Sequence, residues 1–146
     1  MSLKDWERSG WIENHRPSRR EIAEIFSAVS RDLKTSAQPG LDMDWKFAIA
    51  YNAALQSANA ALAASGYRAR REAHHYRVIQ SLAFTIEAEP ELIELLDRFR
   101  KKRNLGTYER AGAISKKEAA EMRNLALLLR DRISAWIKTH HPDLFG

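Results

Sequence analysis

Residues 42–66 read DMDWKFAIAYNAALQSANAALAASG, and this stretch decides the fold class. It predicts one long helix that begins at Asp42 or Asp44, because either carboxylate can accept hydrogen bonds from the first free backbone amides. The helix ends at Gly66, which can adopt the left-handed conformation. Its alanine content favours helix formation and lets neighbouring helices approach closely. We expect its inward face to carry Trp45, Ala48, Ile49, Leu55 and Leu62.

Amphipathic helices are predicted on both sides of this stretch, because apolar residues recur there at spacings of three and four. One helix begins at Ser18 and ends before Pro39, and the last helix of the chain begins at Ser115. Glu21 and Glu118 follow these two serines by three residues, which is the spacing of a capping box. In a capping box each of the two side chains accepts a hydrogen bond from a backbone amide.

Between these helices we expect a third helix at residues 69–86 and a fourth that begins at Glu89 and Pro90, as two helices or as one kinked helix. No stretch shows the period of two that is typical of a strand. The sequence therefore predicts an all-α fold, an up-and-down bundle of four to five helices. We expect residues 1–17 to form an N-terminal arm with a short helix and residues 18–146 to form the helical bundle domain.

The composition excludes several classes of site. The 146 residues are enough to bury a core in one domain, and they include no cysteine, which excludes disulfides, thiolate zinc sites and thiol catalysis. A chain without cysteine is typical of a reducing compartment, so we expect a cytoplasmic location. No apolar run fits a signal peptide or a membrane span, so we expect no membrane partner. His74–His75 and His140–His141 are adjacent pairs rather than ligands at helical spacing, so we expect no metal and no cofactor.

The charge favours a polyanionic partner, because the formal net charge is +5 and the cations gather in one segment. Between residues 98 and 110 only Glu109 opposes them, and they are Arg98, Arg100, Lys101, Lys102, Arg103 and Arg110. Such a run is often only a solvated face, and cations in the last turns of a helix interact favourably with its dipole. Both interpretations stay open for the run as a whole.

Arg103 differs from the other cations in its position. Leu92, Leu96 and Phe99 form the inward stripe of the fourth helix, and Arg103 is the next position on that stripe. Burying an unpaired guanidinium costs on the order of several kcal/mol. Arg103 therefore requires a carboxylate, a cleft or a seam between subunits.

Residues 66–77 read GYRARREAHHYR and interleave cations with aromatic rings, a composition that suits phosphate contact and base stacking. Arg70 and Arg71 are the candidate phosphate ligands there. His75 shares an apolar stripe with Ile79, so we interpret it as a core histidine rather than a catalytic one. Asn52 interrupts the inward face of the long helix, where it either fixes the helix register or lines a cleft with Arg103.

The segment RNLGTY at residues 103–108, at the end of a helix and ahead of a capped final helix, resembles the signature of the HEPN family (higher eukaryotes and prokaryotes nucleotide-binding domains). The resemblance extends to AIAYNAALQ at residues 48–56 and to His74–His75, and it covers residues 18–137. It implies an all-α bundle that forms a homodimer and works beside a small nucleotidyltransferase in a toxin–antitoxin pair. Many members of the family are metal-independent ribonucleases.

The resemblance also implies a set of site residues. In the active members an arginine, the polar residue after it and a histidine a few residues on form the catalytic site. Arg103 and Asn104 match this pattern, whereas Tyr108 stands where the histidine is expected. A phenol with a pKa of about 10 is a poor general base at neutral pH, so we expect any endoribonuclease activity to be weak.

The sequence thus predicts an HEPN-like homodimer that binds RNA or a nucleotide. Its catalytic candidates are Arg103, Asn104 and Tyr108, and its binding candidates are Arg98, Arg100, Lys102, Arg110, Arg70, Arg71 and Asn52. The alternative is a non-catalytic protein–protein interaction module. In that alternative the basic run docks an acidic partner such as a nucleotidyltransferase, and the apolar helix faces serve oligomerisation.

Overall fold

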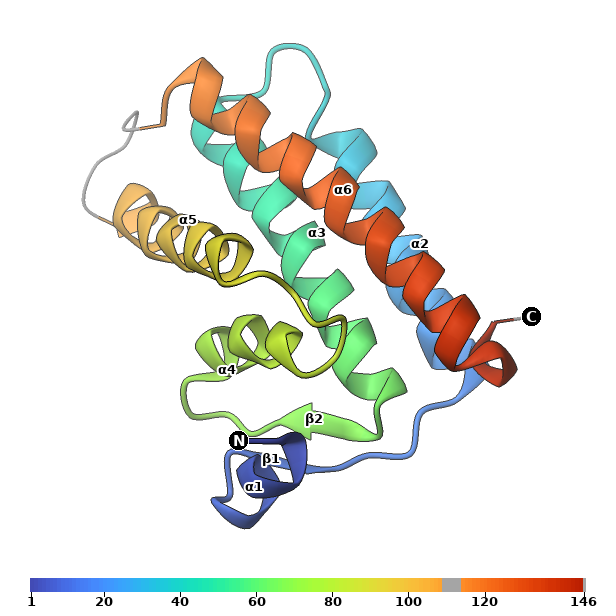
Figure 1. Cartoon of the computed structure of the whole chain (residues 1–146). Helices are drawn as coiled ribbons and strands as arrows, with labels where there is room; N and C mark the ends of the chain where they lie inside the picture. The colour runs from blue at the N-terminus through green and yellow to red at the C-terminus, as the bar shows by residue number, and fades with distance from the viewer. Residues whose placement is uncertain (109–113, 146) are drawn as a thin grey trace.

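The helix α3 (Met43–Ala64) is the centre of the molecule, and four other helices pack against it. In the computed structural model the described residues are 1–108 and 114–145, and residues 105–108 are described by their backbone alone. α2 (Arg19–Thr35) and α6 (Lys116–His140) lie along α3, and α4 (His74–Gln80) and α5 (Pro90–Tyr108) lie on its other side (Figure 1). The all-α bundle that the sequence predicts is confirmed.

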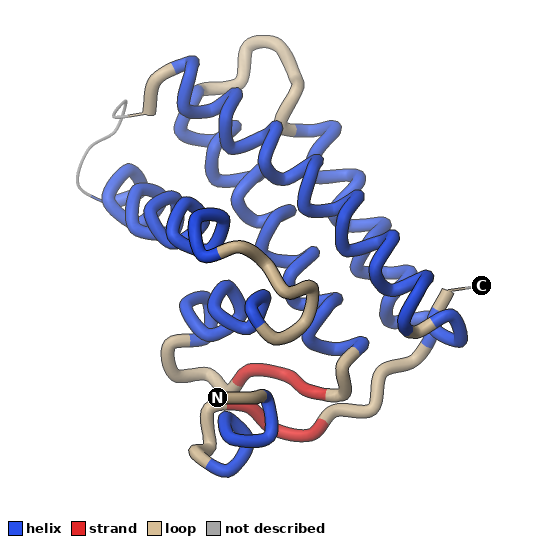
Figure 2. The backbone as a smooth tube through the Cα atoms, in the orientation of Figure 1, coloured by secondary structure: helices blue, strands red, loops and turns tan. Residues whose placement is uncertain are grey.

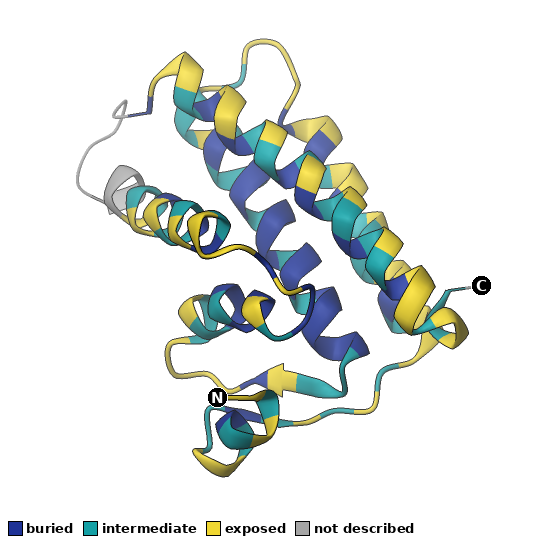
Figure 3. Cartoon of the chain, viewed as in Figure 1, coloured by how far each residue is buried: buried dark blue, intermediate teal, exposed yellow. Residues whose placement is uncertain are grey.

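The predicted inward face of α3 is confirmed at Leu55 and Leu62, which are buried, and is wrong at its first residues. Trp45 is 62% exposed, and Ala48 and Ile49 are only partly buried, whereas Phe47 and Tyr51 are fully buried. Figure 3 shows α3 buried along most of its length, while α2 and α6 expose their outer faces. A helix that is contacted on several sides has no single apolar stripe, so its periodicity does not define the orientation.

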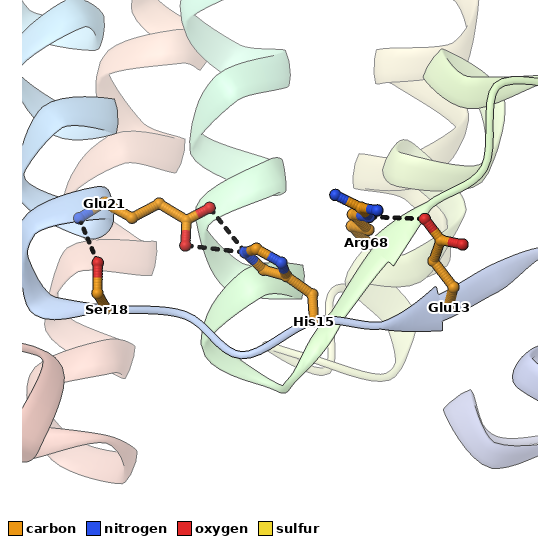
Figure 4. A network of polar contacts seen from close by, with 5 residues as sticks. All are labelled: Glu13, His15, Ser18, Glu21 and Arg68. Carbon is orange, nitrogen blue, oxygen red and sulfur yellow. Dashed lines mark hydrogen bonds and ion pairs between the residues drawn. The ribbon is translucent and has the colours of Figure 1, made fainter.

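The capping predictions have different outcomes at the two helix starts. Ser115 and Glu118 form the complete reciprocal box at the start of α6. Ser18 accepts a hydrogen bond from the backbone amide of Glu21 at 3.1 Å, but the Glu21 carboxylate lies 2.8 Å from His15 Nε2 instead of completing the box (Figure 4). The carboxylate thus ties the start of α2 to the arm.

The predicted third helix at residues 69–86 is wrong at both ends, because α4 spans only His74–Gln80. Residues Tyr67–Ala69 form the strand β2, which pairs antiparallel with β1 (Ile12–Asn14) from the arm (Figure 2). Gly66 ends α3 with a positive φ of 95°, as expected, and so allows the chain to turn directly into β2. The two paired segments are far apart in the chain, so no local sequence pattern predicts the strand pairing.

The choice between two helices and one kinked helix is settled in favour of two. α4 is followed by a short 3₁₀ helix, η1 (Ser81–Ala83), and the chain then turns through Glu87, whose φ is +53°, before α5 begins. Another 3₁₀ helix, η2 (Pro142–Leu144), follows α6. No helix of the described residues is both long and apolar enough to cross a bilayer.

The arm packs its aromatic side chains on α4 and η1. Its helix α1 (Leu3–Arg8) buries Trp6, whose ring meets Phe84 edge-on at a centroid distance of 5.2 Å. The Arg77 guanidinium lies 3.6 Å from the centroid of the Trp11 ring, a cation–π contact that joins the arm to α4. The arm therefore packs against the second half of α4 and against the residue that follows η1.

The dense packing around α3 gives a stability prediction. Ala61 is fully buried, so we expect Ala61→Leu to lower the free energy of unfolding by about 1 to 3 kcal/mol through overpacking. The same substitution at Ala135, which is exposed on α6, is expected to be close to neutral. Urea denaturation of both variants measures this. An Ala61→Leu variant as stable as the wild type would contradict the close approach of helices to α3.

Candidate functional site

Arg103 is placed by the apolar residues that precede it on α5. Leu96 and Phe99 are buried, and Phe99 meets Phe47 of α3 edge-on at a centroid distance of 5.4 Å. One turn further on, Arg103 is partly buried, and its guanidinium carbon lies 5.6 Å from the centroid of the Tyr51 ring. The stripe therefore carries a cation onto the aromatic face of a core residue of α3.

Tyr51 joins α3 to α4 as well as to α5. Its side chain is 1% exposed, and its hydroxyl lies 3.5 Å from Nδ1 of His75, the second residue of α4. Burial raises the pKa of Tyr51 to about 12, against the opposing effect of the charge on Arg103. The phenol therefore keeps its proton at neutral pH.

His75 is the group that the sequence interpretation undervalued. It is partly buried, and burial, followed by the positive charge of Arg103, lowers its pKa below the ordinary value of 6.5. The neighbouring His74 and Arg100 lower that pKa further. The imidazole is therefore uncharged at neutral pH, in a position where two guanidinium groups create a positive potential.

Arg100 extends this arrangement towards solvent. Its Nε donates to Asp97 Oδ1 at 2.8 Å, and its guanidinium carbon lies 5.5 Å from the centroid of the Tyr76 ring. Tyr76 is among the exposed aromatic residues of the described chain, so its ring is accessible to a stacking partner. Arg100 and Tyr76 thus offer a cation beside an accessible aromatic face.

A second basic group lies at the turn between β2 and α4. The side chains of Arg70, Arg71 and His74 line an open pocket of about 620 Å³. Glu13 of the arm also lines it, and it binds Arg68 at 2.6 Å (Figure 4) and Arg70 at 3.6 Å. The His74 and His75 rings are 5.9 Å apart, so this pocket adjoins the cluster around Tyr51.

These two groups together form what we call the basic face. It comprises Arg70, Arg71, His74, His75, Tyr76, Arg100 and Arg103. It combines guanidinium groups, imidazoles and an accessible phenol ring, which are the groups that bind phosphates and stack on bases.

The other candidates from the sequence are placed differently. Asn52 does not line a cleft with Arg103, because its side chain donates to Asp32 Oδ2 of α2 at 3.0 Å. That contact agrees with the interpretation of Asn52 as a residue that fixes helix register. Lys102 is paired with Glu118 of α6, whose pKa it lowers by a hydrogen bond.

Arg98 and Asn104 are exposed on α5. The Tyr108 side chain and Arg110 lie outside the described residues. Among the residues that the structure describes, no three potential metal ligands come together.

Sequence reasoning missed Tyr51 and Tyr76. Both lie within stretches that the sequence had already marked, residues 48–56 and 66–77. Sequence alone does not define how α3, α4 and α5 pack. This packing determines which residues of those stretches lie near Arg103.

Comparisons with protein-family models, with curated proteins and with solved structures found no match to this chain.

Proposed function

We propose that this chain is an HEPN-like helical bundle that binds RNA or a nucleotide across its basic face. One observation carries the proposal: Arg100, Arg103 and His75 lie beside the rings of Tyr51 and Tyr76. These five residues come from three helices, α3, α4 and α5. Guanidinium groups bind phosphate oxygens with charge-assisted hydrogen bonds, and the exposed ring of Tyr76 can stack on a base of any sequence, whereas Tyr51 is buried. The pocket of Arg70 and Arg71 extends the same surface, so a strand of several nucleotides can follow it.

The resemblance to the HEPN family supports the same proposal, because it singles out Arg103 and Asn104 independently of their contacts. From that resemblance we also propose that the chain works with a small nucleotidyltransferase as part of a toxin–antitoxin pair. The phosphate-binding role of Arg103 does not depend on that partner.

One observation favours the alternative of a protein–protein interaction module. Lys102 is paired with Glu118, and Lys101 lies 3.4 Å from Asp97, so part of the basic run is neutralised by carboxylates of the same chain. Those cations are less available to phosphates. The proposal of nucleic-acid binding therefore depends on the packing of Arg103 against Tyr51 and on the β2–α4 turn rather than on the charge of the whole run.

We also propose that two copies associate through α5 and α6. Leu128 is 69% exposed, and it lines a hollow of about 330 Å³ together with Leu92, Leu125, Leu129, Glu89 and Arg132. An exposed apolar side chain next to an apolar hollow suits a two-fold interface, because each copy can place its Leu128 in the hollow of the other. Arg103 lies about three turns further along α5, near one end of such a seam.

The first prediction concerns RNA affinity. If about three phosphates are bound, the affinity for a single-stranded RNA should fall about 20-fold between about 50 and about 200 mM salt. Arg103→Ala should weaken binding and flatten this salt dependence. Arg20→Ala, an exposed arginine on α2, is the matched control and should retain wild-type binding. Fluorescence anisotropy measures the affinities.

Two outcomes would contradict this prediction. A wild-type chain that does not bind RNA even at low salt would favour the interaction module. An Arg103→Ala variant with a much lower melting temperature and unaltered binding would show that Arg103 is a structural residue.

The second prediction concerns association. The wild type should sediment as a dimer at micromolar concentration, and Leu128→Glu should make it a monomer, because the glutamate would be buried without a partner. Trp45→Glu changes another exposed apolar residue, at the start of α3, and should leave the dimer intact. A strictly monomeric wild type would contradict the proposed interface.

The third prediction concerns catalysis at Tyr108. The wild type should cleave RNA weakly at neutral pH without metal, because an unperturbed phenol is a poor proton acceptor. Tyr108→His should gain cleavage activity if the resemblance places this residue correctly. Incubation of both proteins and of Tyr108→Phe with mixed RNA measures this. Vigorous cleavage by the wild type that disappears in Tyr108→Phe would show that the chemical reasoning is wrong.

A further inference from the structure

The contact between Tyr51 and His75 links the phenol proton to the tautomer of the imidazole. A buried phenol needs an acceptor for its proton, and His75 Nδ1, at 3.5 Å, occupies that position. The pKa of Tyr51, raised to about 12 by burial, keeps the proton on the phenol. The phenol can donate to an unprotonated Nδ1, and in that arrangement the single proton of the neutral imidazole is on Nε2.

In that tautomer His75 is a hydrogen-bond donor at Nε2 rather than a proton acceptor. A histidine whose Nε2 already carries a proton cannot take one from a ribose hydroxyl through that nitrogen. It can, however, donate to an anion without first being charged. The same geometry that argues against a catalytic base therefore provides a binding group.

The surroundings of His75 favour an anion at this point. On the α5 side, Arg103 contacts the same Tyr51 ring that His75 contacts. Arg100 also lies on α5, and Asp97 partly balances its charge. From α4 its neighbour is His74.

The remaining elements packed against α4 add little net charge. In β2 the Arg68 guanidinium is bound to Glu13, and in η1 the Ser81 hydroxyl donates to the Val78 carbonyl. The charges nearest to His75 are therefore mainly positive.

We propose that His75 is a phosphate-binding residue that acts with Arg100 and Arg103, donating from Nε2 to a phosphate oxygen of the bound RNA or nucleotide. This inference rests on the proposed function, and it assigns to His75 a role that the sequence interpretation gave to no histidine. Tyr51 is the positioning residue, because it holds the imidazole in the tautomer that donates. The ligand class is a phosphodiester of RNA or the phosphate of a nucleotide.

Because a bound phosphate changes the protonation of His75, the binding affinity should depend on pH. A bound phosphate favours the imidazolium over the neutral imidazole, so it raises the pKa of His75. Affinity must then rise as the pH falls through the pKa of the complex, and it must level off below the pKa of the free protein. The free protein has a lowered His75 pKa, so the rise extends below pH 6.5.

The main experiment measures the affinity for an oligouridylate that has hydroxyl groups at both ends. Neither uracil nor a phosphodiester titrates between about pH 5.5 and about pH 8, so the pH dependence reports on the protein. We expect the wild type to bind several-fold more tightly at the lower pH. His75→Gln keeps an amide donor but does not titrate, so it should bind at the higher pH and lose the increase.

Two further variants complete the comparison. His75→Ala lacks the donor, so it should bind about tenfold more weakly than the wild type at the higher pH and, like His75→Gln, lose the increase at the lower pH. His140→Gln, an exposed histidine that stacks on Trp136 of α6, is the matched control and should keep the wild-type profile. A His75→Gln variant with the full wild-type pH dependence would overturn the inference.

A second measurement tests the tautomer in the free protein. Nitrogen NMR of labelled histidine should find His75 protonated at Nε2, and Tyr51→Phe should relax that preference. An imidazole protonated at Nδ1 in the wild type would overturn the positioning role of Tyr51.

The same NMR signal identifies the ligand and separates the two proposals. Saturation with the oligouridylate should raise the pKa of His75, and an equal effect from uridine monophosphate would identify a nucleotide as the ligand. If the oligouridylate binds without changing that pKa, the inference is wrong while the proposed function stands. If neither ligand binds at low salt, the proposed function itself fails.

Discussion

The close packing of α3 is the constraint on which the rest of the molecule depends. Ala54, Ala58 and Ala61 are almost completely buried, and they let α2 and α6 lie along the helix while α4 and α5 occupy its other side. Short side chains allow small interhelical distances, so dispersion contacts are gained over the whole length of the helix. Most of α3 is enclosed in this way, so most of the side chains at the protein surface come from the elements around it.

Tyr51 connects that core to the basic face. Its ring is buried against the neighbours of α3, while its hydroxyl reaches His75 and its face lies under Arg103. A cation on an aromatic face keeps part of its hydration and gains the attraction of the ring quadrupole, so a partly buried arginine is tolerated there. A positive charge that would be unfavourable in a core can attract an anion at this partly buried position.

The arm gives the basic face its second half. β1 pairs with β2, and Arg77 of α4 stacks on Trp11, so the turn that carries Arg70 and Arg71 is held from both sides. Glu13 balances two of the arginines near this turn, which limits their mutual repulsion in the free protein. In the proposed complex, a phosphate would take the place of that carboxylate as the partner of these arginines.

The sequence by itself determined the features that depend on near neighbours in the chain: the all-α class, the capped start of α6 and the position of Arg103 one turn after Phe99. Helix periodicity and capping act over three or four residues, so they can be read locally. Only the tertiary structure decided that residues 67–69 form a strand, that Asn52 faces Asp32 and that His75 meets Tyr51. Each of these depends on a partner 20 or more positions away in the chain, and such a pairing is chosen by the packing of the whole core rather than by any local preference.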